Sequence, residues 1–118
     1  MLTEYKPRYR KAILDSSIRN FGKENAKQVE LLLDTNTDFV FLWIVKNKFK
    51  GVIASYLMPD KENTLYTLSW NSKDVATGVR LAIEAEKEAV NRGIKKVIYL
   101  RLDKTGQGNH KVYEKEIG

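Results

Sequence analysis

Cysteine is absent from the sequence, and histidine occurs only once. The chain therefore has no disulfide framework, no thiolate metal site and no cysteine nucleophile, and we expect no metal centre. No apolar run approaches the roughly 20 residues that a membrane-spanning helix needs. The N-terminus also lacks the apolar stretch and cleavage site of a signal peptide. We expect one domain over residues 1–118, a cytoplasmic location and no membrane partner.

What the sequence does contain is enough apolar residues for one packed core, 42% of the total. It has 21 lysine and arginine residues against 15 acidic ones, which gives a formal net charge of +6. Such a balance favours anionic partners, including nucleic acid, acidic proteins and phosphorylated cofactors. The basic residues are scattered among acids, however, so the sequence does not favour a dedicated nucleic-acid binder.

Apolar spacing in the first half predicts two helices followed by three strands. The expected ranges are 7–21 and 24–33 for the helices and 39–49, 52–58 and 64–70 for the strands, with a further short strand at 2–5. The stretch "NKFKG" and residues 59–63 are expected to be turns. Because the connections between the three strands are short, they should form an antiparallel meander.

The second half is expected to hold a helix at 79–92 that ends at Gly93, and then a strand at 95–102. A strand, a helix and a strand in succession imply a parallel pair within a mixed sheet. The stretch "DKTGQG" is expected to be a loop. A final helix is expected over "NHKVYEKEI", with Asn109 as its N-cap.

The stretch "TLSWNSKDVATGVRLAIEAEKEAVNRGIKKVIYLRL" resembles the core of the GNAT acetyltransferase superfamily. In that family a strand leads into a loop of pattern Q/R-x-x-G-x-G/A, then a helix, then a strand preceded by "rGikkv". Here the loop would run from Lys73 to Gly78, and the ending "NHKVYEKEIG" is similar to the family's terminal helix. The resemblance covers nearly the whole chain. It implies an α/β fold (an α+β mixed sheet), GNAT-like and of the acyl-CoA N-acyltransferase type, that lacks the last strands.

The family binds acetyl-CoA, with the pyrophosphate against backbone N–H groups at the helix start and the pantetheine arm between two splayed strands. The resemblance implies a cofactor site made of Leu68, Trp70, Lys73, Val75, Ala76, Thr77, Gly78 and Asn109.

Three departures from the family pattern stand in the loop itself. Lys73 stands at the first position, where it can still meet a phosphate, though as a point charge rather than an arginine fork. Ala76 replaces the first glycine, and Asp74 brings a carboxylate near the expected pyrophosphate. Gly78 alone stands where the pattern has glycine. It is either a remnant of the phosphate loop or an ordinary glycine between loop and helix.

The resemblance also implies the chemistry of acetyl transfer. A backbone N–H of Leu68 or Trp70 would polarise the thioester carbonyl, and Tyr113 would protonate the departing sulfur unless it only packs the last helix onto the sheet. The strand "TLYTLSW" has no acid to serve as the general base. Glu62, in the preceding turn, is the nearest one. Tyr66 and the single histidine, His110, are the remaining proton carriers.

The family pattern normally continues with two more strands, so the strand at 95–102 is expected to be an open edge. A homodimer or a partner chain would then cover that edge. Small GNAT-like proteins also occur in bacteriophages, including ones that have lost catalysis. The sequence thus predicts an acetyl-CoA-dependent N-acetyltransferase that acts on an amine of a small molecule or protein by direct transfer. The alternative is a non-catalytic GNAT-like binding or assembly module, such as a phage protein.

Overall fold

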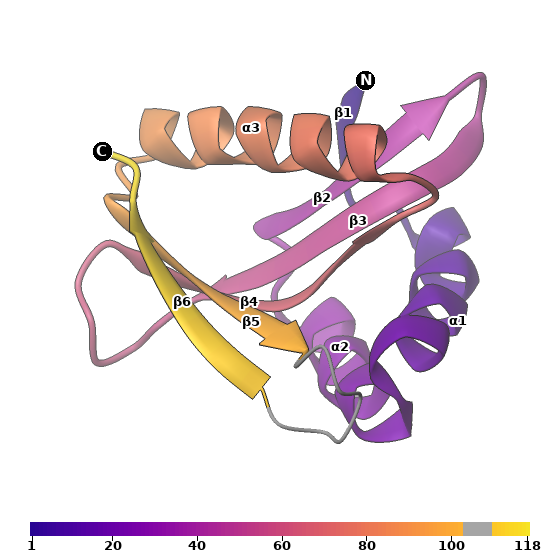
Figure 1. The fold of residues 1–118 in the computed structure, drawn as a ribbon, viewed down its shortest axis with the longest axis horizontal. Coiled ribbons are helices and arrows are strands. Elements are labelled where there is room, and N and C mark those ends of the chain that lie inside the picture. Colours follow the sequence, from indigo (N-terminus) through magenta and orange to yellow (C-terminus); the bar gives the residue numbers. More distant parts are fainter. Residues whose placement is uncertain (103–109) are drawn as a thin grey trace.

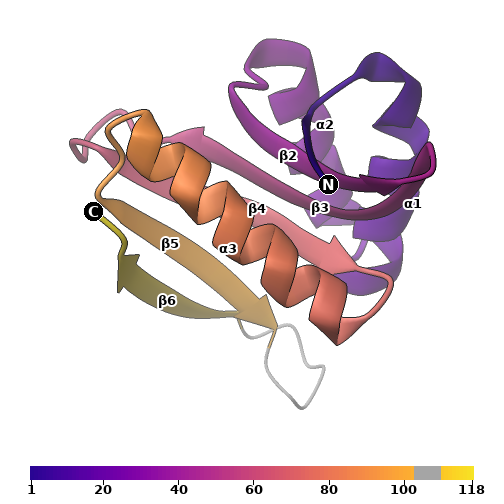
Figure 2. The ribbon, with the colours of Figure 1, turned by 90° about the horizontal axis from the view of Figure 1, so that it is seen from above.

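The computed structural model describes residues 1–102 and 110–118, and in these residues a six-stranded mixed sheet lies between helices (Figures 1 and 2). In chain order the described elements are β1 (Leu2–Glu4), the 3-10 helix η1 (Pro7–Tyr9), α1 (Arg10–Phe21), α2 (Lys23–Thr35), β2 (Phe39–Val45), β3 (Lys48–Leu57), β4 (Thr64–Ser72), α3 (Val75–Asn91), β5 (Lys96–Leu102) and β6 (His110–Glu116).

The strands lie side by side in the order in which they occur along the chain. All neighbouring pairs are antiparallel except β4 and β5, which are parallel and are joined by α3. This arrangement confirms the predicted meander, the predicted parallel pair and the mixed sheet.

Helices cover both faces of the sheet, with α3 on one face and α1 and α2 on the other (Figure 2). On α3, Leu81, Ala85 and Ala89 recur at helical spacing and are buried in one core cluster. On the opposite face, Ile13 of α1 and Val29 of α2 are fully buried in a second cluster. The amphipathic patterns in the sequence therefore decide which face each helix covers. No helix in the described residues is both long enough and apolar enough to cross a membrane.

The turn between the first two long strands lies earlier than the sequence predicted. Lys46 and Asn47 have φ angles of 51° and 64°, and β3 already begins at Lys48. A two-residue turn with both residues in the left-handed region matches the twist of a hairpin, and asparagine tolerates it well. The expected strand at 39–49 is thus divided, and the "NKFKG" turn was placed too late.

The C-terminal helix predicted over "NHKVYEKEI" is wrong, because residues 110–116 form β6. This strand pairs antiparallel with β5 along its whole length, from Lys96 opposite Glu116 to Leu102 opposite His110. Valine and tyrosine in "KVYEKE" favour strands, and neighbouring β5 offers an open ladder. The prediction that β5 is an open edge is therefore also wrong, and no partner chain is required to cover it. The loop "DKTGQG" and Asn109 lie outside the described residues.

Candidate functional site

The hydrogen-bonding ladder of β4 is interrupted on both sides at Leu68. Toward β3, Thr67 and Ser69 pair with consecutive residues, so Leu68 between them is the extra residue of a β-bulge. Toward β5, the parallel pairing ends one residue earlier, where Thr67 lies opposite Tyr99. Two interruptions at the same point leave backbone groups of β4 without strand partners.

Beyond this point β4 and β5 separate. β4 continues to Ser72 and turns into α3, whereas the described partner of the last three residues of β5 is β6. Figures 1 and 2 both show the carboxyl ends of β4 and β5 pointing apart. The two strands thus splay apart, as the resemblance predicted for β4 and β5.

A side chain of α2 binds the backbone at the bulge. Asn25 Nδ2 donates a hydrogen bond of 2.7 Å to the Leu68 carbonyl oxygen. Only the amide nitrogen can donate to a carbonyl, so this contact fixes which way the Asn25 amide points. Asn25 therefore holds one peptide group at the interruption of the ladder in a set orientation.

A buried polar cluster holds the residues of β4 that follow the bulge, Ser69 and Asn71, against α1. Ser16 donates to Asn71 Oδ1, Asn71 Nδ2 donates to Ser69 Oγ at 3.0 Å, and the hydroxyls of Ser17 and Ser69 lie 3.3 Å apart. All four side chains are buried. Fully paired polar groups of this kind fix strand position more specifically than apolar packing does.

The first turn of α3 begins at Val75, four residues before the predicted start, because Asp74 caps it. The Asp74 carboxylate accepts hydrogen bonds from Thr77 N at 2.8 Å and from Thr77 Oγ1 at 3.0 Å. The bond from the Thr77 backbone N–H is the main reason why the pKa of Asp74 lies below its usual value. The stretch "KDVATG" is thus mostly helix, and a carboxylate already occupies part of the helix's anion-binding end.

Gly78 lies inside this first turn, where α3 comes close to β4. A Cβ added at Gly78 would stand 2.7 Å from Ser72 Oγ, nearer than real contacts allow. On the same side, Trp70 Nε1 donates to the Gly78 carbonyl oxygen at 3.1 Å. Packing against β4 is therefore a sufficient reason for glycine at this position.

Two lysines lie beside the capped helix end. Lys73, which is exposed, donates its backbone N–H to the Lys50 carbonyl oxygen at 2.8 Å. The positive charge of Lys50 also contributes to the lowered pKa of Asp74. Ala76 is exposed at the same end of α3. The residues predicted to bind the pyrophosphate thus lie close together at the start of α3. The carboxylate of Asp74 lies there too, with Lys73 and Lys50 beside it.

Trp70 and Tyr113 line one groove, between α3 and β6. The ring of Tyr99 lies between them, with centroids 5.3 Å from Trp70 and 6.3 Å from Tyr113. Glu86 of α3 also lines this groove, and its carboxylate accepts bonds from Tyr99 OH at 2.7 Å and from Lys115 Nζ at 2.9 Å. Burial raises the pKa of Tyr99, so its phenol keeps its proton.

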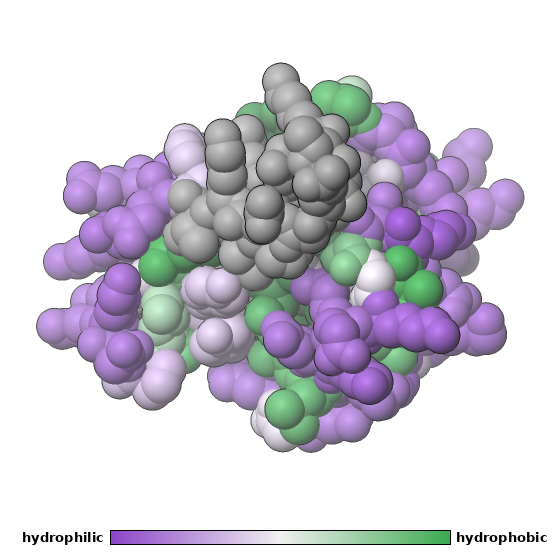
Figure 3. All heavy atoms as spheres, turned by 60° about the horizontal axis from the view of Figure 1, so that its bottom comes forward, coloured by the Kyte–Doolittle hydropathy of each residue, from purple (hydrophilic) through white to green (hydrophobic). Residues whose placement is uncertain are grey.

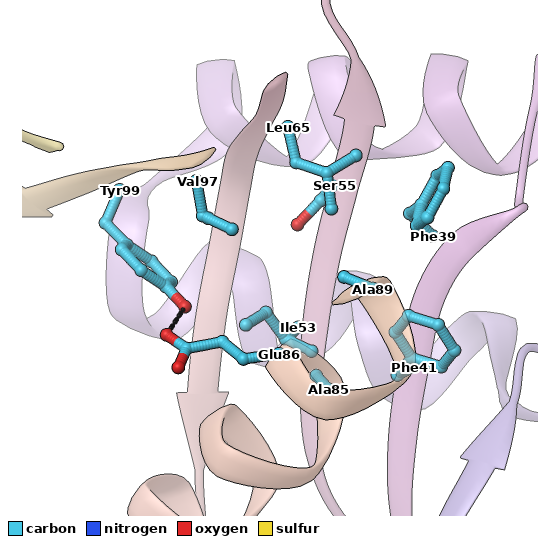
Figure 4. Close-up of a pocket in the computed structure, with 10 residues that line it drawn as sticks. All are labelled: Phe39, Phe41, Ile53, Ser55, Leu65, Ala85, Glu86, Ala89, Val97 and Tyr99. Atoms are coloured by element: carbon cyan, nitrogen blue, oxygen red, sulfur yellow. Dashed lines mark hydrogen bonds between the residues drawn. The ribbon is translucent and has the colours of Figure 1, made fainter. Parts of the chain in front are cut away.

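The space beneath α3 is too tight for a ligand. Figure 4 shows mostly apolar side chains from the sheet and from α3 around it, with Tyr99 pointing at Glu86. Its volume is about 10 Å³, room for no more than one water molecule. A ligand therefore does not fit beneath α3.

The candidate bases are not gathered at the bulge. Glu62 is exposed in the turn before β4, and the four residue steps from Thr64 to Leu68 span about 13 Å. Tyr66 lies beside Tyr56, with ring centroids 5.5 Å apart. Burial is the main cause of its raised pKa, so the phenol keeps its proton and is not available as a base. His110 begins β6, but its side chain, like Asn109, is outside the described part of the structure.

Two residues of the candidate site, Asn25 and Glu86, could not be identified from the sequence. Asn25 is a polar residue within an amphipathic helix, and nothing in the sequence pairs it with Leu68, which is 43 positions away. Glu86 stands in a run of charged residues that resembles a solvated helix face. No group of three or more potential metal ligands occurs among the described residues.

Comparison with solved structures identifies the fold. An acetyltransferase of the GNAT family from Staphylococcus aureus matches at a TM-score of 0.72 and 12% identity, over 100% of this chain and 99% of its own. An aminoglycoside 6'-acetyltransferase type Ii matches at 0.68 and 17%, over 93% and 76%. PaiA N-acetyltransferase from Thermoplasma acidophilum, in complex with coenzyme A, matches at 0.63 and 13%, over 98% of both chains. No family model and no curated protein matches the sequence. The chain therefore has the fold of the GNAT acetyltransferases.

Proposed function

We propose that this protein binds acetyl-CoA in the gap between β4 and β5 and transfers the acetyl group directly to an amine. The observation that carries the proposal is the double interruption of the β4 ladder at Leu68, which offers backbone groups to a ligand in that gap. The GNAT fold supports it, because at least two proteins with this fold are described in complex with coenzyme A.

The residues present fit the pantetheine better than the pyrophosphate. Backbone groups at Leu68 and Trp70 lie along the gap, where the amide-rich pantetheine arm would find partners. At the pyrophosphate end, the N–H groups of Val75 and Ala76 and the ammonium of Lys73 favour an anion. The Asp74 carboxylate opposes it, since it accepts the N–H of Thr77 and adds a negative charge.

When bound, acetyl-CoA would supply an activated acyl group, which passes to the amine nitrogen as the thiol leaves. In this proposal a backbone N–H at Leu68 or Trp70 polarises the acyl carbonyl. Tyr113, on β6 rather than on a helix, lines the groove beside Trp70 and stays our candidate for the proton donor to sulfur. Glu62 is the more distant candidate for the base.

The capped helix end favours one alternative, a non-catalytic GNAT-like module for binding or assembly. In that case Asp74 replaces the phosphate permanently, and the fold serves another partner. The cytoplasmic location and the phage-type origin stay predictions under both proposals.

A thermal-shift titration with coenzyme A separates the two proposals. Ligand at 100 times its dissociation constant stabilises a protein by about 2.7 kcal/mol. We expect a saturable rise in melting temperature. Ala76→Glu should abolish this rise, because its carboxylate would stand at the exposed pyrophosphate end of α3.

Asn91→Glu is the matched control, since it adds the same charge at the far end of the same helix. It should leave the coenzyme A shift unchanged. No shift of the unmodified protein at millimolar coenzyme A would refute the transferase and favour the binding module. Equal losses in both variants would show that the pyrophosphate does not bind at the start of α3.

A further inference from the structure

A second groove lies on the face of the sheet opposite α3, between α2 and the pair β3 and β4. Its volume is about 390 Å³. The described residues that line it are Gln28, Leu31, Leu32, Thr35, Asn36, Tyr56, Leu57 and Leu68. Figure 3 views the molecule from the end where α2 lies and shows small apolar areas within a mostly hydrophilic surface.

This groove reaches the interrupted point of β4. Leu68 lines it, and Leu68 is the bulge residue at which the pairing of β4 with β5 has also ended. A molecule in the groove would therefore approach the same peptide groups that the proposed function assigns to the acyl group, but from the face that carries α2.

The lining has no charge of either sign among the described residues. Leucine and tyrosine side chains form most of it, and the amides of Gln28 and Asn36 and the hydroxyl of Thr35 supply its polarity. An unpaired ammonium or carboxylate would lose its hydration there without gaining an ionic partner. The groove therefore suits a body that is neutral and largely apolar.

One buried acceptor lies behind this groove, on Asn25, which is bonded to the lining residue Leu68 but does not itself line the groove. Asn25 Oδ1 has less than 1 Å² exposed and no hydrogen-bond partner among the described residues. The bond from Asn25 Nδ2 to Leu68 O prevents the amide from turning around to satisfy it. A buried acceptor without a donor is unfavourable, so Asn25 gains a hydrogen bond if a ligand N–H displaces the side chains that cover it.

We infer that this groove binds the acyl acceptor, and that the acceptor is a primary amine on a neutral, largely apolar body. The inference rests on the proposed function. The leucines and Tyr56 hold the body, and the amine nitrogen lies at the Leu68 end of the groove, where a displacement of the lining side chains gives it Asn25 Oδ1 as an acceptor. A polyamine or an aminoglycoside carries several ammonium groups, which would need carboxylates that the described lining does not provide.

Acetyl transfer to a panel of amines tests this substrate class. The probes are 2-phenylethylamine and tryptamine on one side, and spermidine and kanamycin on the other. Free coenzyme A thiol can be followed with a thiol reagent, because the protein has no cysteine to react. We expect kcat/KM to be at least about tenfold higher for the two arylalkylamines, the size of effect that one poorly solvated charge produces.

A charge placed in the groove should reverse this preference. Leu31 and Leu57 are 65% and 47% exposed, so Leu31→Asp and Leu57→Asp should leave the protein folded. Both variants should lose activity toward 2-phenylethylamine and gain it toward spermidine. Ile18→Asp is the control, because Ile18 is similarly exposed on α1 at 45% and does not line the groove.

Direct binding separates failure of this inference from failure of the proposed function. Amide NMR with 2-phenylethylamine, without coenzyme A, should shift the signals of Asn25 and Leu57. If coenzyme A does not bind but these shifts occur, the groove is an amine site and the transfer reaction is refuted. If coenzyme A binds but spermidine or kanamycin is preferred, or if Leu57→Asp and Ile18→Asp behave alike, the inferred substrate class is overturned.

Discussion

Replacing Gly78 by alanine tests why this glycine is present. A Cβ at position 78 would lie 2.7 Å from Ser72 Oγ, so the Ser72 hydroxyl would have to turn away. It would lose its 2.5 Å hydrogen bond to a backbone carbonyl oxygen, a loss of about 0.5–1 kcal/mol. Within a helix, alanine is otherwise favoured over glycine by about 0.4–1 kcal/mol. In the unmodified background the two effects should nearly cancel, or the variant should be slightly less stable.

Removal of the hydroxyl should change this balance. In a Ser72→Ala background, the nearest remaining atom of residue 72 is its β-carbon, at an ordinary 3.6 Å. Gly78→Ala should then raise the free energy of unfolding by about 0.4–1 kcal/mol, the helix-propensity gain alone. The two positions should therefore show a coupling energy of roughly 1 kcal/mol in a double-mutant cycle.

Urea unfolding of the four proteins measures this coupling. Equal stabilisation by Gly78→Ala in both backgrounds would refute the packing explanation. Coenzyme A affinity provides a separate measurement, because the added methyl group points at β4. If the double variant is stable but no longer binds coenzyme A, Gly78 serves the approach of a phosphate.

Three further predictions concern groups near the gap between the strands. Asp74→Asn keeps a good N-cap but removes the charge, so it should tighten coenzyme A binding by about three- to tenfold in calorimetry. Because the pKa of Asp74 is lowered, its charged form stabilises the fold above the ordinary value of 3.8, and this contribution is lost as the pH falls through the folded value. The acid limb of the stability curve should therefore be flatter in Asp74→Asn, and parallel limbs would contradict the cap. Asn25→Ala leaves the carbonyl oxygen of Leu68 without its side-chain donor and should lower the free energy of unfolding by about 1–2 kcal/mol in urea. It should also lower kcat/KM for the preferred amine, and a loss of stability alone would indicate a merely structural role. Tyr99→Phe removes the hydroxyl that donates a hydrogen bond to Glu86, and it should lower the free energy of unfolding by about 1–2 kcal/mol. An unchanged free energy of unfolding would show that this bond contributes nothing to stability.

Much of the fold was predictable because local patterns and long-range packing agree. The apolar spacing of α1, α2 and α3 matches the faces that these helices bury, and the short connections confine β2, β3 and β4 to a meander. The parallel pair followed from one strand–helix–strand unit. In these segments the residues that determine the structure are near one another in the sequence.

The helix prediction for the C-terminal segment failed because pairing with a neighbouring strand outweighed the local helix signal. "NHKVYEKEI" has charges at helical spacing and a good cap residue, and the resemblance suggested a helix. The unpaired edge of β5 and the strand preference of valine and tyrosine favour β6 instead. A neighbouring strand's open ladder cannot be recognised from a short segment on its own.

The candidate site was predictable only as a set of backbone positions. The sequence located the strand and the helix end, but the bulge at Leu68 depends on the register with β3, which no short motif determines. The pairing of Asn25 with Leu68 depends on how α2 crosses the sheet. Asp74 was recognised as a charge opposed to phosphate, yet its role as a cap that starts α3 earlier was not.

The most direct test of the central claim is an NMR titration of the ¹⁵N-labelled protein with coenzyme A. The claim is that the interrupted strand β4 and the start of α3 together bind this cofactor. The account predicts saturable amide shifts that are largest at Leu68, Trp70, Val75 and Ala76. Unchanged spectra at several millimolar coenzyme A, or shifts confined to other parts of the sheet, would contradict it.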